Sequence, residues 1–141
     1  MRALLLLAIA AALVACGSGS AAGTATSATS LTVTYWPEGT AAGGKQKWTV
    51  ACAPARGTVA RPLAACRKLA AGGPKLFAPM RKDLLCTQIY GGPQVARVTG
   101  TVKGSRVSAS FSRRDGCAIA RWNRVSPWLL PYLEDRPLVL T

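Results

Sequence analysis

The stretch that decides the fold is residues 94–112, which read QVARVTGTVKGSRVSASFS. Apolar and polar residues alternate through both of its arms, and such a period of two is typical of half-buried strands. The residues predicted to face inward are Ala96, Val98, Val102, Val107, Ala109 and Phe111. Gly104-Ser105 supplies a two-residue turn whose twist matches a hairpin. The stretch therefore predicts two antiparallel strands, 94–103 and 106–112.

Four further elements are predicted around this hairpin. Alternation over 31–35 and again over 47–52 predicts two more strands. Pro62 stands where a first helical turn tolerates proline, which predicts a helix over 61–71. Its apolar positions at helical spacing are Leu63, Cys66, Leu69 and Ala70. A shorter helix over 118–123 would turn Ile119 and Trp122 inward, whereas residues 74–85 carry no clear period. Together these elements predict an α+β domain, in which a helix packs on one face of a small antiparallel sheet.

The beginning of the chain is typical of an export signal. Residues 1–15 combine a basic start with an apolar run that is too short to span a bilayer comfortably. Leu13-Val14-Ala15 before Cys16 resembles the lipobox of bacterial lipoproteins, in which that cysteine becomes the lipidated first residue. An ordinary signal peptide, with Cys16 as an unpaired thiol, is the alternative.

This interpretation divides the chain into a signal, a tether, a domain and a tail. Residues 16–30 are rich in glycine, serine, alanine and threonine, the composition of a flexible tether. A folded domain over 31–126 and a proline-broken tail over 127–141 follow. We expect an exported protein held through Cys16 at the outer face of the cytoplasmic membrane or in the cell envelope, or released in secreted form.

Apart from Cys16, the chain has four cysteines, Cys52, Cys66, Cys86 and Cys117. An even number in an exported chain predicts two disulfides, and four cysteines allow three pairings. The sequential pairing closes the shorter loops. In the chain-entropy model, each bridge would stabilise the fold by roughly 3 to 4 kcal/mol.

The chain is strongly basic, with a formal net charge of +13. Its basic residues are scattered rather than grouped in a stripe with interleaved aromatic residues, and export argues against a nucleic-acid partner. Anionic lipid headgroups, wall polymers or an acidic protein fit the charge better. The alternative is that the charge only keeps the domain soluble.

Catalytic groups are scarce. The absence of histidine excludes Ser-His-Asp and Cys-His catalysis. The neighbouring carboxylates Glu134 and Asp135 do not form the opposed pair of a glycosidase. No C-x-x-C pair or glycine-rich phosphate loop is present. We therefore predict a protein that is not an enzyme and that uses no metal and no cofactor.

Residues 86–93, CTQIYGGP, instead suggest a segment offered to another protein. Ile89 stiffens an extended backbone, Cys86 can anchor it, and Gly91-Gly92-Pro93 can end it.

Several of these pieces together resemble the Streptomyces subtilisin inhibitor family, over roughly residues 31–123. They are the run Cys52-Ala53-Pro54, the helix end over 64–73, Cys86 to Tyr90, the hairpin, and Phe111-Ser112 before Cys117. The resemblance implies a five-stranded antiparallel sheet with two helices on one side, the two sequential disulfides, and often a sheet-mediated homodimer. It also implies substrate-like inhibition of serine proteases.

Carried over to this sequence, the resemblance implies that Gln88 enters the primary pocket and that Gln88–Ile89 is the scissile bond. Cys86, Thr87 and Tyr90 would be the neighbouring contacts. Thr87 stands where better-known members have proline, and Gln88 cannot pair with an acidic trypsin-like pocket, so a broad subtilisin-like cleft is expected. The alternative is a non-inhibitory basic envelope domain that binds an acidic polymer or protein, in which Gln88 is only a loop residue.

Overall fold

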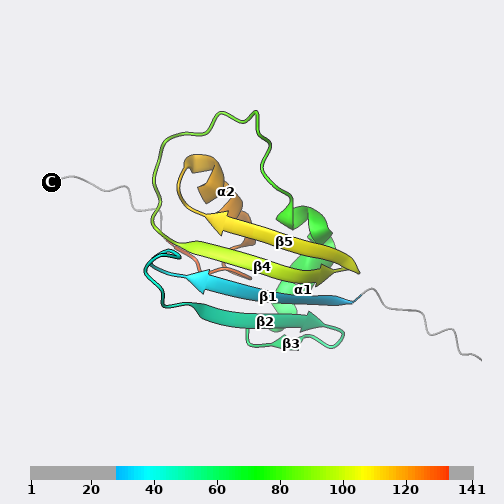
Figure 1. Ribbon diagram of the computed structural model, residues 1–141. Helices are drawn as coiled ribbons and strands as arrows, with labels where there is room; N and C mark the ends of the chain where they lie inside the picture. The colour runs from blue at the N-terminus through cyan, green and yellow to red at the C-terminus, as the bar shows by residue number, and fades with distance from the viewer. Residues whose placement is uncertain (1–27, 134–141) are drawn as a thin grey trace, which may run out of the picture.

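The fold, in a computed structural model that describes residues 28–133, is an antiparallel sheet with two helices on one face (Figure 1). The sheet order is β3-β2-β1-β4-β5. The strands are β1 Thr29–Trp36, β2 Gln46–Cys52, β3 Arg56–Gly57, β4 Val95–Val102 and β5 Ser105–Ser112. The helices are α1 Pro62–Gly72 and α2 Gly116–Val125, with a 3-10 turn, η1, over Gly73–Phe77. The predicted α+β architecture is confirmed.

The core lies between the sheet and the helices. Central strand β1 pairs Val33 with Trp48 of β2 on one side and with Val98 of β4 on the other. The residues predicted to face inward on the 94–112 hairpin are all buried, as are Leu31, Val33 and Tyr35. The period-two pattern therefore assigned the faces of both hairpin strands and of β1 correctly.

The hairpin turn lies one residue earlier than predicted. Its two central residues are Lys103 and Gly104, and Ser105 already pairs with Val102. Both turn residues have positive φ, 49° and 77°. A turn of this kind matches the twist of the strands, and a glycine at its second position adopts that φ without strain. The predicted Gly104-Ser105 turn is therefore wrong by one position.

Helix α1 has nearly the predicted bounds, but part of its predicted apolar face is wrong. Ala65 and Leu69 are buried against the sheet, whereas Leu63 is 57 % exposed and Ala70 is also exposed. The disulfide from Cys66 to Cys52 ties the helix to the end of β2. The small residue Ala65 therefore faces the sheet, and Leu63 lies outside the contact between α1 and the sheet.

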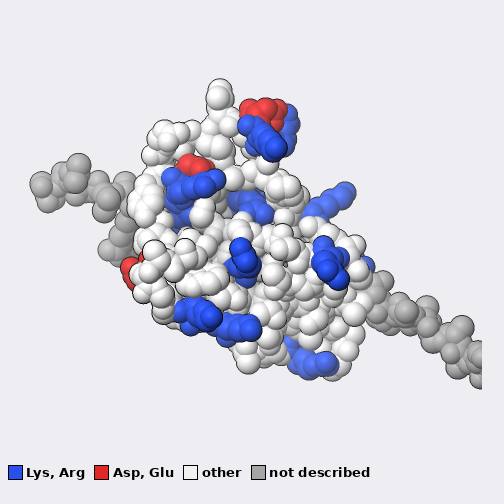
Figure 2. Space-filling view, viewed as in Figure 1, with Lys and Arg blue, Asp and Glu red and all other residues white. Residues whose placement is uncertain are grey.

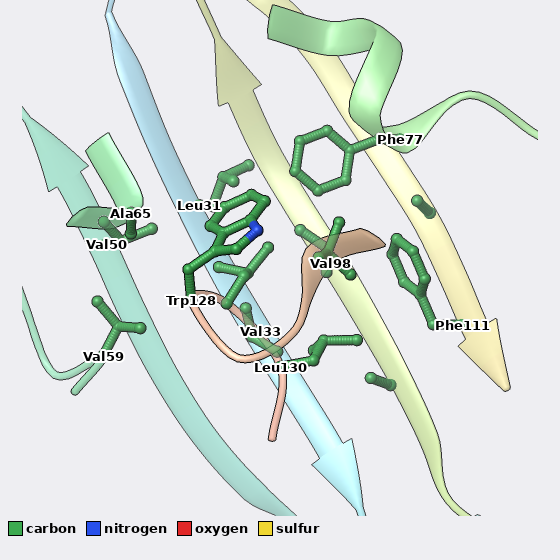
Figure 3. Packing of buried hydrophobic residues seen from close by; sticks show 14 of the residues in the cluster. Leu31, Val33, Val50, Val59, Ala65, Phe77, Val98, Phe111, Trp128 and Leu130 are labelled. Atoms are coloured by element: carbon green, nitrogen blue, oxygen red, sulfur yellow. The ribbon is translucent and has the colours of Figure 1, made fainter. Parts of the chain in front are cut away.

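The segment after Ser126, predicted to be a tail, contributes to the core. Trp128, Leu129 and Leu130 are buried, and Trp128 and Leu130 lie over the strands among Leu31, Val33 and Val98 (Figure 3). Its backbone is also tied down, because the Trp48 indole donates to the Leu129 carbonyl at 3.0 Å and the Trp122 indole to the Pro131 carbonyl at 3.1 Å.

Two segments without a firm prediction also contain short regular structure. η1 buries Phe77, whose ring meets that of Phe111 edge to face at 6.4 Å. The loop after β2 contains the two-residue strand β3. Strand β1 starts at Thr29, within the predicted tether.

Among residues 28–133, no helix has the length and apolar character needed to cross a membrane. The predicted signal and Cys16 lie outside the described residues.

Candidate functional site

The candidate site is a long loop that leaves η1 and returns to β4, over residues 78–94 (Figure 1). It rises from the body of the domain at the end where α2 begins. Thr87, Gln88, Ile89 and Tyr90 are all exposed, with Ile89 61 % and Tyr90 63 % accessible. Two large apolar side chains in water have no structural use inside the domain, so they are available to a partner.

On its amino-terminal side, the loop is fixed to the start of α2. Cys86 and Cys117 form a disulfide with their Cα atoms 5.3 Å apart. The Gly116 amide donates to the Thr87 carbonyl at 2.9 Å. The contact is close enough that a Cβ on Gly116 would lie 2.0 Å from Thr87 Oγ1. The backbone is therefore held immediately before Gln88.

On its carboxyl-terminal side, the loop is fixed by a reciprocal pair of hydrogen bonds. The Gly91 amide donates to the Arg113 carbonyl at 2.8 Å, and Arg113 Nε donates to the Gly91 carbonyl at 2.9 Å. Arg113 is only 1 % exposed. A Cβ on Gly91 would meet Ile119 Cδ1 at 2.8 Å, so the loop lies directly on α2 there. Arg113 therefore holds the backbone two residues after Ile89.

The base of the loop is organised by a second arginine, Arg121 of α2. Its guanidinium donates to the carbonyls of Phe77 and Ala78, each at 3.2 Å, and to that of Ser110. It also lies over the Phe111 ring, 4.2 Å from the centroid. Burial lowers the pKa of Arg121, and the charge of Arg124 lowers it further. An arginine nevertheless keeps its charge at neutral pH.

Between the two anchors lie only residues 88–90. The Gln88 side chain makes a long hydrogen bond from Nε2 to the Cys86 carbonyl, at 3.4 Å, and is otherwise directed to solvent. The bond between Gln88 and Ile89 is thus exposed on a loop whose backbone is fixed on both sides. Such an arrangement can present an extended peptide without a large loss of conformational freedom.

The cysteine frame of the site was predicted, and the two arginines were not. Both sequential disulfides, Cys52–Cys66 and Cys86–Cys117, are confirmed. No role in the site was predicted for Arg113 or Arg121 from the sequence. The sequence does contain an indication that Arg113 is buried. Arg113 lies two residues after Phe111 and so continues the inward-facing series Val107, Ala109 and Phe111. A charged residue at an inward position of a strand pattern indicates a buried polar contact.

One cluster near the loop has the composition of a metal site. The ligand atoms of Cys86, Asp115 and Cys117 lie within 4.8 Å of one another. The two sulfurs are bonded to each other, however, and a disulfide lacks the thiolates that bind metal. The Asp115 carboxylate accepts from the Ala118 amide at 2.8 Å and so caps α2. A disulfide and a helix cap therefore account for the cluster.

Comparison with known proteins places the chain in a family. Residues 25–113 match the family described as Subtilisin inhibitor-like. Among solved structures, the chain is similar to Streptomyces caespitosus sermetstatin, crystallised in complex with Bacillus licheniformis subtilisin. The identity is 25 %, the TM-score is 0.49, and the similarity covers 74 % of this chain and 99 % of that one. No curated protein matches. Because the family match spans more than half of the sequence, the chain belongs to the subtilisin inhibitor-like family.

Proposed function

We propose that the protein is a substrate-like inhibitor of a subtilisin-like serine protease and that its loop presents the Gln88–Ile89 bond. The observation that carries the proposal is the anchoring of the exposed residues 88–90 on both sides, by Thr87 and Cys86 before them and by Gly91 after them. Family membership supports the inhibitory activity. The two disulfides and the family also indicate an exported protein.

Binding would follow the way a substrate binds. The extended backbone around Gln88 adds a strand to the cleft of the protease, so that main-chain hydrogen bonds supply affinity and side chains supply selectivity. Gln88 would occupy the primary pocket, with Thr87 before it and Ile89 and Tyr90 after it. The Gln88 amide carries no positive charge and so cannot form an ion pair in an acidic primary pocket, which favours a broad cleft over a trypsin-like one.

The anchors would separate an inhibitor from a substrate. The protease serine attacks the Gln88 carbonyl, forms an acyl-enzyme and releases the Ile89 amine. In a flexible peptide that amine diffuses away and water completes the hydrolysis. Here Gly91 is held by Arg113, so the Ile89 amine would stay close to the ester. Its return attack re-forms the peptide bond and frees the protease serine.

A titration tests the proposed inhibition. The purified chain is mixed with subtilisin at rising molar ratio, and residual activity is measured on a small chromogenic substrate. We expect activity to fall in proportion to the added chain and to be lost near equivalence. Gln88→Pro is the negative control, because proline removes the Gln88 N–H and fixes φ at the residue that would enter the primary pocket. Unchanged activity at large excess, with Gln88–Ile89 simply cut, would rule out inhibition.

We also propose that Cys16 carries a lipid that holds the domain at the cell envelope. The lipobox-like Leu13-Val14-Ala15-Cys16 run supports this. Cys16→Ser is expected to move the protein from the membrane fraction to the soluble fraction, with its inhibition unchanged. Continued sedimentation of the variant with membranes would argue against lipidation. The homodimer implied by the family resemblance remains a prediction.

A further inference from the structure

Helix α1 presents to solvent a surface that combines three cations with one exposed leucine. The two fully buried residues of α1 face the sheet. On the side away from the sheet lie Arg61, Leu63, Arg67 and Lys68, all of them exposed, with Leu63 at 57 %. We call these four residues the α1 surface. Cations attract an anionic membrane, and an apolar side chain among them can enter the boundary between headgroups and acyl chains.

A hollow adjoins the α1 surface and adds a further cation. Its volume is about 540 Å³, and its lining includes Arg61 and Lys68 on one side and Arg124 and Trp128 on the other. The Trp128 indole donates to the Arg124 carbonyl at 3.2 Å, which holds the second side in place. Arginine and lysine both donate hydrogen bonds to phosphate oxygens. The hollow therefore offers three cations to one phosphate headgroup.

No carboxylate neutralises these cations in the part of the chain that the structure describes. Its acidic residues are Glu38 in the loop after β1, Asp83 in the loop 78–94 and Asp115 at the cap of α2. The recorded ion pairs, Arg81–Asp83 and Arg114–Asp115, involve neither the α1 surface nor Arg124. The positive potential around α1 is therefore available to an anionic partner.

The chain enters the sheet beside the carboxyl-terminal end of α1. The Gly104 amide donates to the Ala28 carbonyl at 3.1 Å, so Ala28 lies against the β4–β5 turn. Lys103 of the same turn reaches the end of α1, because a Cβ on Gly73 would lie 3.9 Å from its Cδ. Ala28 is 12 positions after Cys16, a length that spans at most about 40 Å. A lipid on Cys16 would therefore keep the α1 surface within reach of the bilayer.

We propose that the α1 surface docks on an anionic lipid bilayer, with phosphate headgroups at its cations and Leu63 at the acyl boundary. The proposal builds on the lipid proposed for Cys16, because an anchor and a basic surface on one chain bind together more firmly than either alone. The protease-binding loop stays accessible in this arrangement. Gly91 and Arg113 meet beyond the end of β5, whereas Ala28 lies at the start of β1, the other end of the sheet (Figure 1).

The test measures sedimentation with vesicles in the absence of any lipid anchor. It uses the chain from residue 16 onward with Cys16→Ser, since the apolar residues 1–15 would themselves bind lipid and every described element follows residue 28. Vesicles of equal parts phosphatidylglycerol and phosphatidylcholine are compared with vesicles of phosphatidylcholine alone. We expect saturable binding to the anionic vesicles only, and weaker binding as salt is raised.

Variants of the α1 surface locate the binding. Arg61→Gln with Lys68→Gln should lose about fivefold in affinity per cation removed, and so about 25-fold together. Arg67→Gln with Lys68→Gln should lose as much without changing the residue that precedes α1. Leu63→Gln should lose about fivefold, because a polar amide does not gain from leaving water.

The matched control removes the same charge from a different part of the surface. Figure 2 shows basic side chains over the side of the molecule that carries the sheet as well, so net charge alone could attract lipid from several directions. Lys82→Gln with Arg114→Gln changes two exposed cations outside α1 and its hollow. This control should bind almost as the original chain does. Circular dichroism of all variants is expected to match the original, which separates lost binding from lost folding.

Several results would overturn the proposal. They are an absence of binding to anionic vesicles at low salt, equal binding to phosphatidylcholine alone, and equal losses in the α1 and control variants. Unchanged binding of Leu63→Gln would contradict its place at the acyl boundary. Tighter binding to soluble polyphosphate than to anionic vesicles would assign the cations to a soluble polyanion. Because the chain tested carries no lipid and no protease is present, these failures are distinct from failure of the proposed anchor or of the proposed inhibition.

Discussion

Gln88 is the residue on which the specificity of the proposed inhibitor depends. It is exposed, and its one recorded hydrogen bond runs to the Cys86 carbonyl at 3.4 Å, so its replacement does not disturb the fold. We expect Gln88→Lys to redirect inhibition toward trypsin-like proteases, because the ammonium group can pair with an acidic primary pocket. The measurement is the inhibition constant against trypsin and against subtilisin.

Leu85→Lys is the control for this exchange. Leu85 is fully exposed on the same loop, and the change adds the same charge outside residues 86–90. If both lysine variants gain trypsin inhibition equally, the gain comes from charge alone and Gln88 is not the specificity residue.

We expect Arg113 to control the rate at which the protease cleaves the Gln88–Ile89 bond. Arg113→Lys keeps the charge and loses the planar fork that bonds the Gly91 carbonyl from a buried position. A hydrogen bond from a charged group contributes about 1.5 to 3 kcal/mol, so cleavage of the bound variant should be faster by about tenfold or more. Mass spectrometry of timed samples with equimolar subtilisin measures this rate.

Arg114→Lys provides the comparison for Arg113, because its side chain is 75 % exposed next to the same segment. Its cleavage rate should stay at the original value. A cleavage rate for Arg113→Lys that equals that of Arg114→Lys would contradict the anchoring role of Arg113.

The residues of the site differ in how far the sequence could predict them. The roles of Gln88 and Ile89 come from the family resemblance, through their positions after Cys86, and they stay a prediction; the structure shows that both residues are exposed. Arg113 and Gly116 act on the loop through contacts across more than 20 residues of chain, and no local pattern specifies such a pairing. Only the inward position of Arg113 in the β5 series indicated that its charge would be buried against something.

At the scale of elements, the two disulfides connect different parts of the fold. Cys52–Cys66 joins β2 to α1, whereas Cys86–Cys117 joins the loop to α2. Their sequence separations of 14 and 31 residues correspond to about 3 and about 4 kcal/mol in the chain-entropy model. Removing either pair by double Cys→Ala substitution should therefore lower the free energy of unfolding by a similar amount.

Inhibition should respond to only one of these removals. The variant without Cys86–Cys117 should be cut by subtilisin as a substrate, whereas the variant without Cys52–Cys66 should still inhibit at temperatures where it is folded. Urea unfolding and subtilisin titration measure the two effects separately. Equal loss of inhibition in both variants would mean that stability, and not local anchoring of the loop, controls the activity.

The pairing of β4 with β1 depends on Gly100. Its φ of +139° is unfavourable for other residues, and a Cβ there would lie 2.1 Å from the Ser30 carbonyl oxygen. We expect Gly100→Ala to lower the free energy of unfolding by about 2 to 4 kcal/mol, measured by urea titration. Gly43→Ala, also at positive φ but with no atom within 4 Å, should cost about 1 kcal/mol or less. Equal losses in the two variants would show that the close approach does not matter.

The elements themselves were largely predictable, because each depends on a repeating local pattern. Alternation placed four strands, and Pro62 placed the start of α1 within one residue. The errors came from contacts between elements. Leu63 is exposed because the bond at Cys66 fixes which side of α1 meets the sheet. Trp128 to Leu130 are core residues because the chain after α2 folds back over β1 and β4. The local sequence of a proline-broken segment contains no pattern that predicts this packing.

For the whole molecule, the structure separates two surfaces that composition could not. The net charge of +13 fitted either an anionic partner or a domain that is only kept soluble, and it gave no location for the charge. The strand register places Lys47, Arg56, Arg97 and Arg106 on the sheet face opposite the helices, away from the anchored loop. One domain therefore presents an anchored, exposed loop at its end and a basic sheet face at its side.

The central claim is that the domain holds both ends of the Gln88–Ile89 bond well enough for the bond to be remade. The most direct measurement starts from chain already cleaved at this bond, adds a trace of subtilisin, and follows the intact form by mass spectrometry. The account predicts that intact chain reappears and that the same ratio of intact to cleaved chain is reached from either starting form. Complete cleavage of the intact chain, with no intact chain formed from the cleaved one, would contradict it.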